Sequence, residues 1–158
     1  MKNSVSKMII VFLAACSVGK VAYSCWTAVP FEEIVKQNPL IVAGNVEKVV
    51  VVKPRGHESG YDTAFIKVRK VLKDDTKNPN IKTGAYVRLS MPSINNKYRS
   101  SVDLLYQRGQ DGIWLLSYDN ERGAFRTGRP DQLQPLSQEQ KIKEIISVKA
   151  PTTNKTHR

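Results

Sequence analysis

The sequence predicts a mainly β protein, a small five-stranded OB-like antiparallel barrel with a short helix before it and another helix after it. Residues 40–52 (LIVAGNVEKVVVV) are apolar and rich in β-branched side chains, which is typical of a long buried strand. Shorter alternating runs follow at close spacing, and helical patterns occur only at residues 30–38 and 137–146. A partly open Greek-key barrel is the simplest arrangement of five such strands.

The composition is that of one globular domain with a basic excess. The chain has 158 residues, 41% of them hydrophobic and 25% charged, which excludes a disordered polypeptide. The net charge is +11, from 25 Lys and Arg against 14 Asp and Glu. Three of the cations and none of the acids lie in residues 1–24, so the rest of the chain keeps a net charge of +8. This excess favours solubility and anionic partners, namely nucleic acid, lipid headgroups or acidic glycans.

Residues 1–24 predict an export signal. Lys2 and Lys7 precede the apolar run MIIVFLAA at residues 8–15, and small residues follow it. The run is shorter than the roughly 20 apolar residues that a membrane-spanning helix needs. We therefore expect an exported protein, located in the periplasm or outside the cell.

Two cleavage sites are compatible with this leader. Residues 22–24 (AYS) put small side chains at the −3 and −1 positions before Cys25, as in ordinary signal peptides. Residues 13–16 (LAAC) resemble a bacterial lipobox, which implies a leader of residues 1–15, lipid attachment at Cys16 and an outer-membrane anchor. Either cleavage leaves Cys25 as a lone thiol, so the fold must depend on its hydrophobic core and not on internal disulfides.

The first helix and first strand are predicted directly after the leader. Residues 30–38 (PFEEIVKQN) begin with Pro, have two acids in the first turn and place apolar side chains on one face, which predicts a two-turn helix. The first strand follows at residues 40–52. Gly44 within it marks a bulge, a bend or a close approach of backbones.

Four further strands complete the predicted barrel. Residues 61–72 and 85–91 alternate between apolar and polar side chains, which predicts two half-exposed strands. The run IWLLSY at residues 113–118 predicts a fourth strand, and a polar turn joins it to a fifth at 124–127. The pattern at residues 102–106 is compatible with either a short strand or a helical turn.

The carboxyl-terminal part reads as a loop, a helix and a tail. Residues 128–135 predict a loop, after which Ser137 and Gln140 form a capping-box pattern at the start of the closing helix. Residues 149–158 lack apolar side chains and predict a disordered basic tail. The folded unit is therefore expected to be a single domain, residues 25–148.

Four motifs occur in a recognisable order over residues 25–128, namely FEEIVKQN, PLIVAGNVEKV, KVRKVLK and GQDGIWLLSY. Together they resemble the bacterial relatives of the tissue inhibitors of metalloproteinases, the netrin-like group of OB-folds. The resemblance implies an OB-like barrel. The family's animal inhibitors chelate a protease zinc through the amino group and carbonyl of their first Cys, and Cys25 matches that position if cleavage occurs before it. Thr27 replaces the second Cys of the usual Cys-x-Cys start.

Residues suited to catalysis or metal binding are sparse. The sequence has only two histidines, His57 and His157. His57 could share a metal ion with Glu58 and Asp62, and otherwise it is a solvated loop residue. Ser-x-x-Lys occurs only in the leader, and neither Gly-x-Ser-x-Gly nor a phosphate-binding P-loop is present. We therefore expect no catalytic activity, no cofactor and no metal.

A binding surface has more support from the sequence. Several basic side chains fall on outward positions of the predicted strands, interleaved with aromatic ones. Such a mixture suits an anionic polymer through charge and stacking, although export argues against nucleic acid and favours a membrane surface or a cell-wall polymer. An ordinary solvated barrel face is the alternative. The residues of this predicted face are Lys67, Arg69, Lys70, Tyr86 and Arg88, with Phe65 beside them.

These observations lead to three functional hypotheses. The first is an exported bacterial envelope protein that serves as a non-catalytic binding or interaction module for an envelope component or a protein. The second is a secreted protease inhibitor that acts through Cys25, with Trp26 as a further contact. The third is a hydrolase whose site has no recognisable motif.

Overall fold

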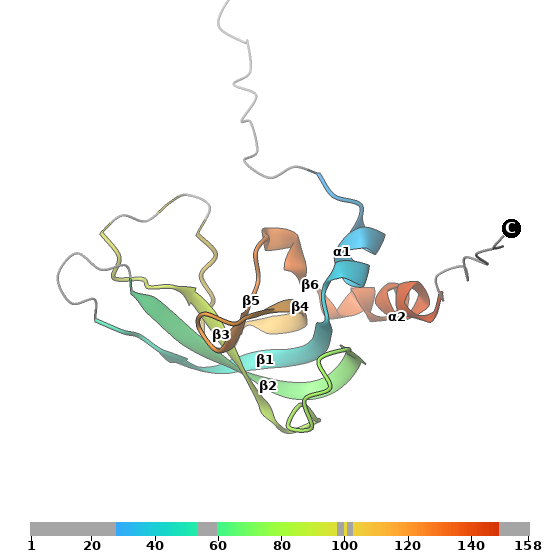
Figure 1. Ribbon diagram of the computed structural model, residues 1–158, viewed down its shortest axis with the longest axis horizontal. Helices are drawn as coiled ribbons and strands as arrows, with labels where there is room; N and C mark the ends of the chain where they lie inside the picture. Colours follow the sequence, from blue (N-terminus) through green and yellow to red (C-terminus); the bar gives the residue numbers. More distant parts are fainter. Residues whose placement is uncertain (1–27, 54–59, 98–99, 101–102, 149–158) are drawn as a thin grey trace, which may run out of the picture.

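The computed structural model describes residues 28–53, 60–97, 100 and 103–148 (Figure 1). The cleavage sites and the basic tail at residues 149–158 lie outside these ranges, so the predictions for them stay predictions. The same holds for the individual residues Cys16, Cys25, Trp26, His57, Glu58 and His157.

The described chain is mainly β and forms an OB-like barrel between two helices, as the sequence predicts. The strands follow one another around the barrel in the order β1-β2-β3-β5-β4, and β4 pairs back onto β1 to close it. Helix α1 precedes the barrel and α2 follows it. The bounds of the elements are α1 (Phe31–Gln37), β1 (Leu40–Val50), β2 (Tyr61–Asp74), β3 (Tyr86–Pro92), β4 (Asp111–Asp119), β5 (Ala124–Arg126) and α2 (Glu139–Ser147).

The barrel is mixed and not wholly antiparallel, which corrects the sequence prediction. Strands β3 and β5 run parallel and meet through a single pair, Leu89 with Phe125. The reason is that the number of strands in the ring is odd. Strand directions that alternate around a closed ring return to their starting sense only if the number of strands is even, so a closed ring of five must contain one parallel pair.

Short elements fill the segment between β5 and α2, where the sequence predicts a loop. They are two 3₁₀ turns, η1 (Pro130–Gln132) and η2 (Leu136–Gln138), and the two-residue strand β6 (Leu133–Gln134), which pairs with β4. The predicted capping box is wrong. Ser137 lies inside η2, and the residue that caps α2 is Gln138, whose side chain makes no capping hydrogen bond.

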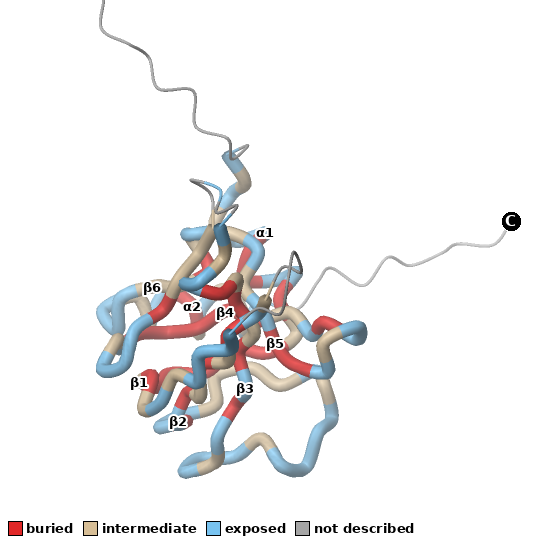
Figure 2. The backbone as a smooth tube through the Cα atoms, turned by 90° about the vertical axis from the view of Figure 1, so that its left-hand side faces the viewer, coloured by how far each residue is buried: buried red, intermediate tan, exposed pale blue. Residues whose placement is uncertain are grey.

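The barrel interior holds the larger of two apolar clusters, and burial is concentrated where the strands converge (Figure 2). Trp114 of β4 is fully buried there, and its indole Nε1 donates to the carbonyl oxygen of Gly44 at 2.9 Å. Tyr106 packs edge-on against Trp114, with ring centroids 5.0 Å apart. Residues 103–106 form neither strand nor helix, so the part of the undecided segment that the structure describes is an irregular stretch anchored by Tyr106.

The second cluster lies on the outside of the barrel, where α1 and α2 cover one side of it (Figure 1). The outward positions of β1 and β4 are apolar here, and Ile142 of α2 is fully buried against them. The buried members of this cluster are Ile34, Val35, Ile41, Ala43, Ile113, Leu115 and Ile142.

None of the helices in the described ranges is long and apolar enough to span a bilayer.

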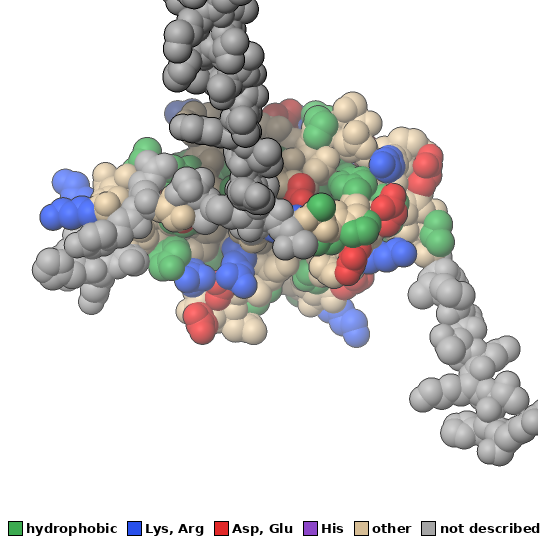
Figure 3. All heavy atoms as spheres, turned by 90° about the horizontal axis from the view of Figure 1, so that it is seen from above, with side chains coloured by type: hydrophobic (Ala, Val, Ile, Leu, Met, Phe, Trp, Pro, Cys, Tyr) green, Lys and Arg blue, Asp and Glu red, His purple; other side chains and the backbone are tan. Residues whose placement is uncertain are grey.

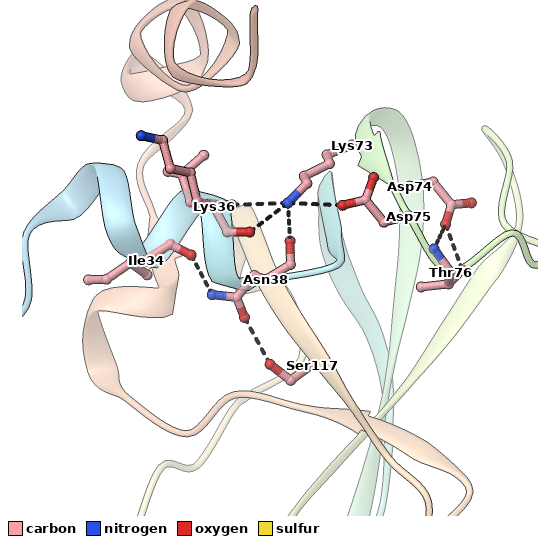
Figure 4. Close-up of polar contacts among 9 residues, drawn as sticks. Ile34, Lys36, Asn38, Lys73, Asp74, Asp75, Thr76 and Ser117 are labelled. Carbon is pink, nitrogen blue, oxygen red and sulfur yellow. Dashed lines mark hydrogen bonds and ion pairs between the residues drawn. The ribbon is translucent and has the colours of Figure 1, made fainter. Parts of the chain in front are cut away.

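The carboxyl end of α1 is fastened to the barrel by two polar side chains (Figure 4). Lys73 of β2 donates from Nζ to the carbonyl oxygens of Lys36 and Asn38, each at 2.9 Å, and so satisfies groups that a helix end leaves without partners. The buried Asn38 amide donates to the Ile34 carbonyl at 2.7 Å and accepts hydrogen bonds from Ser117 and Gln132. A helix of seven residues is too short to be stable alone, so these bonds and the apolar cluster hold it.

Gly44 marks a close approach of two backbones, one of the three interpretations that the sequence offers. A Cβ atom at this position would lie 2.4 Å from the carbonyl oxygen of Lys67 in β2. The register between β1 and β2 also shifts between Ala43 and Gly44, so the position is irregular as well as crowded. Only glycine fits there.

Candidate binding face

A β-bulge in β1 turns two consecutive polar side chains to the outside of the barrel. The register with β2 slips between Val46 and Lys48, which makes Glu47 the extra residue. Val46 and Val49 both pack toward the interior cluster, whereas strict alternation would place them on opposite faces. Glu47 and Lys48 therefore both lie on the outer surface.

The outer positions of β2 and β3 continue this surface. Lys48 stands opposite Phe65 across the β1–β2 ladder. Phe65 in turn pairs with Arg88, and Lys67 pairs with Tyr86, across the β2–β3 ladder. Three of the residues predicted from the sequence, Lys67, Tyr86 and Arg88, are thus brought together beside Phe65.

Three of these side chains form a charge-neutral group. The Tyr86 hydroxyl donates to Oε2 of Glu47, while Lys67 Nζ lies 3.6 Å from Oε1 of Glu47 and 5.8 Å from the Tyr86 ring centroid. The hydrogen bond from Tyr86, with the nearby charges of Lys67 and Arg108, lowers the pKa of Glu47. The same bond raises the pKa of Tyr86. The Tyr86 ring is therefore held in place as a neutral phenol, and Lys67 is already compensated.

Three other cations of this surface differ from Lys67 in this respect. Lys48, Arg88 and Arg108 make no ion pair with any residue in the described ranges. Lys48 and Arg108 line a hollow of about 620 Å³, together with Glu47, Phe65 and Tyr86. We call the surface made by Glu47, Lys48, Phe65, Lys67, Tyr86, Arg88 and Arg108 the open face.

Arg108 is a member of the open face that the sequence analysis did not identify. It lies in the turn before β4, outside every predicted strand. Gly109 N donates to the Val46 carbonyl at 2.7 Å and Val46 N donates to the Gln110 carbonyl at 2.9 Å, so the turn is bonded to the bulged part of β1. The QRGQ sequence signals a turn, but only the tertiary pairing shows which surface that turn borders.

Arg69 and Lys70 were predicted to belong to this face, but the structure directs them elsewhere. The register of β2 against β1 slips at Arg69, so both residues point outward beyond the open face. Arg69 bonds to Asp111 of β4, and Lys70 Nζ lies 2.7 Å from Glu139 of α2. Both are neutralised by acids.

Several surface charges on the helix side of the barrel are paired. Around the α2 end, Lys and Arg side chains stand beside Asp and Glu (Figure 3). Glu139 lies 2.6 Å from Lys143 as well as 2.7 Å from Lys70. Lys143 has the larger effect of these two partners, and together they lower the pKa of Glu139 to about 2.

Asp62, the only member of the predicted metal-binding combination that the structure describes, is buried and has a structural function. Its Oδ1 accepts a hydrogen bond from Val52 N at 2.8 Å, and its Oδ2 accepts one from Ile94 N at 2.9 Å. These bonds tie the end of β1 to the loop after β3. Within the described ranges, no three His, Cys, Asp or Glu residues are grouped to hold a metal ion.

The fold and the open face together define a class, a small five-stranded OB-like barrel with an uncovered basic and aromatic surface. No protein-family model matches the chain, and no curated protein sequence matches it either. The structure supports the netrin-like resemblance only at this coarser level, that of the barrel fold.

Proposed function

We propose that this protein is an exported, non-catalytic binding module of the bacterial envelope, a distant member of the netrin-like OB-folds, which holds an anionic polymer on its open face. The observation that carries the proposal is the imbalance of charge there. Lys48, Arg88 and Arg108 lie around the exposed Tyr86 and the half-buried Phe65 and make no ion pair with the described residues, whereas Lys70 on the helix side is paired.

The position of this face on the barrel supports the proposal. OB-folds bind oligosaccharides and oligonucleotides on the surface of their second and third strands, and Phe65, Lys67, Tyr86 and Arg88 lie on those strands. The predicted export signal favours an acidic glycan of the envelope over nucleic acid. Phe65 and Tyr86 offer apolar rings for stacking, and the cations offer charge.

A titration of the mature protein with hyaluronan, a linear glycan with a carboxylate on every second sugar, tests the proposal. Isothermal titration at low and high salt should show binding that weakens with salt, because exposed charges are screened. The double variant Arg88→Ala/Arg108→Ala should bind about tenfold more weakly, which corresponds to about 1.4 kcal/mol.

The matched control is Lys36→Ala/Lys141→Ala, which removes the same net charge from exposed positions on α1 and α2. The control should keep the affinity of the unmodified protein. An equal loss in both double variants would mean that only net charge matters. That result, or binding that does not respond to salt, would overturn the proposal.

The protease-inhibitor hypothesis is tested separately at the amino terminus. Mass spectrometry of the exported protein should show either a free amine on Cys25 or a lipid on Cys16. A lipid-modified Cys16 makes Cys25 internal and removes the inhibitor hypothesis. It leaves the proposed binding function intact and places the protein on the outer membrane.

A further inference from the structure

Three hollows in the barrel surface are neighbours, because each shares lining residues with the next. The first is the hollow of about 620 Å³ on the open face, and Tyr86 also lines the second, of about 170 Å³, between β3 and β5. The third, of about 370 Å³, lies at the end of the barrel beside Pro39. Asn78, Tyr118 and Phe125 line both the second and the third hollow. We call this connected series the track.

The track exists because the barrel is weakly closed between β3 and β5. The only residue pair that joins these two strands in the described ranges is Leu89 with Phe125, so the first residues of β3 have no strand beside them on that side. Ile81, in the connection between β2 and β3, lies over this gap and packs against the interior cluster. A shallow seam remains between the connection and β5.

The chemistry of the lining changes along the track. Unpaired cations lie at the open face and reach the seam with Arg88, whereas the residues that line the third hollow include no charged side chain. Asn78 supplies an amide there, whose Oδ1 also accepts a hydrogen bond from Asn80 N, and Thr76 supplies a hydroxyl that also donates to Asp74. Aromatic rings occur along the whole length: Phe65 is half-buried, Tyr86 is 52% exposed and Tyr118 is 50% exposed.

This gradient fits a sugar chain better than a nucleic acid strand. Sugar rings have apolar faces that lie against aromatic side chains, and their hydroxyls pair with amides and hydroxyls such as those of Asn78 and Thr76. A nucleic acid carries a phosphate at every nucleotide and needs cations along its whole path. The residues that line the third hollow include no cation.

We propose that the track binds one linear oligosaccharide lengthwise, with an acidic sugar at the open face and neutral sugars over the seam and the barrel end. The proposal rests on the proposed function, since it extends the same ligand beyond the open face. Tyr118 and Asn78 are then specificity-determining residues for chain length.

A series of cello-oligosaccharides of increasing length, each with a single glucuronic acid at one end and neutral sugars after it, tests this inference. The affinity of the unmodified protein should rise with length and then level off once the fragment fills the track. Tyr118→Ala should weaken the binding of the longer fragments about tenfold and leave the affinity for the shortest binding fragment unchanged. Tyr86→Ala should weaken the binding of every fragment.

Two further variants protect the test against an unfolded protein. Tyr118 packs edge-on against Phe125 with centroids 5.1 Å apart, so Asn78→Ala, at an exposed loop position, serves as a second probe of the same end. Tyr61→Ala removes an exposed tyrosine that stacks on Arg122 and is not among the residues that line the three hollows, and it should bind like the unmodified protein.

The outcomes separate this inference from the proposed function. The inference about the track is overturned if Tyr86→Ala weakens binding but Tyr118→Ala and Asn78→Ala do not, or if affinity does not depend on length. The proposed binding function of the open face is retained in both cases. If no fragment shows salt-sensitive binding, both are overturned. Tighter binding of single-stranded oligothymidine, sensitive to Tyr118→Ala, would replace the glycan with nucleic acid.

Discussion

Two parts of the outer barrel surface differ in what covers them. On the helix side, the outward positions of β1 and β4 are Ile41, Ala43, Ile113 and Leu115, and α1 and α2 lie over them. Further along β1 and on β2 and β3, the outward positions form the open face, which no described helix covers. Gly44, where the backbones of β1 and β2 approach closely, stands between the two parts.

The difference shows how to separate structural from functional residues on a barrel. Where helices pack, outward side chains are aliphatic and several of the surrounding surface charges are paired, as Lys70 is with Glu139. On the open face, which no described helix covers, aromatic and basic residues stay accessible, as they do at interaction sites. The following four predictions test this division, from the largest expected effect to the smallest.

Ile142→Ala should strongly destabilise the protein. Ile142 is fully buried between α2 and the barrel, and removing a buried isoleucine side chain costs about 2–5 kcal/mol. Urea denaturation measures the loss. Ile94→Ala, at a position that is 55% exposed, is the matched control and should change stability little. Equal losses in the two variants would show that α2 is not part of the core.

Gly44→Ala should destabilise the barrel by about 1–3 kcal/mol, because the new methyl group meets the backbone oxygen of Lys67 and forces β1 and β2 apart. Thermal denaturation detects this change as a lower Tm. Gly128→Ala adds the same methyl group where the nearest atom is 3.7 Å away, so its Tm should stay close to that of the unmodified protein. A harmless Gly44→Ala would contradict the close approach described above.

Asn38→Ala should cost about 1–3 kcal/mol, because it removes the buried amide and leaves Gln132 and Ser117 without their shared acceptor. The loss should appear in urea denaturation and in faster amide exchange of α1. The control is Asn95→Ala, whose exposed side chain makes no hydrogen bond to the described residues. If α1 exchanges no faster, the fastening shown in Figure 4 does not hold the helix.

The pairing of Glu139 should make α2 slightly sensitive to acid. Its pKa is about 2 in the folded protein against an ordinary value of 4.5, so its contribution is complete above about pH 4.5 and is lost as the pH falls through about 2. Glu139→Gln should therefore lower the Tm a little at neutral pH, and the difference should vanish toward pH 2. Glu121→Gln, at an exposed turn position, should show no such convergence.

Much of the fold could be predicted from the sequence because the strands carry clear local signals. The apolar run around Val42 and Val46, the alternation of β2 and β3, and the glycine at position 44 all describe local environments, and the structure confirms them. The parallel pair between Leu89 and Phe125 has no local signal, because it results from closing an odd number of strands.

The candidate site was harder to predict, because bulges move side chains between surfaces. A two-residue alternation drawn through β2 places Arg69 with Lys67 and turns Lys70 to the other side, whereas the bulge at Arg69 leaves both outside, directed toward β4 and α2. The bulge in β1 does have a signal in the sequence, because two polar residues separate the inward-facing Val46 and Val49. Arg108 joins the face through pairing that no pattern in its own turn reveals.

The seam between β3 and β5 also bears on how the barrel fluctuates. β5 is held by three residue pairs to β4 and by one to β3, so it can detach while the long β1–β2 ladder stays intact. The lowest-energy opening of the barrel therefore begins at this strand. A ligand that lies across the seam would contact both β3 and β5 from outside. It should therefore slow amide exchange in β5 more than in β1. Binding would then strengthen a closure that the strands themselves provide only through Leu89 and Phe125.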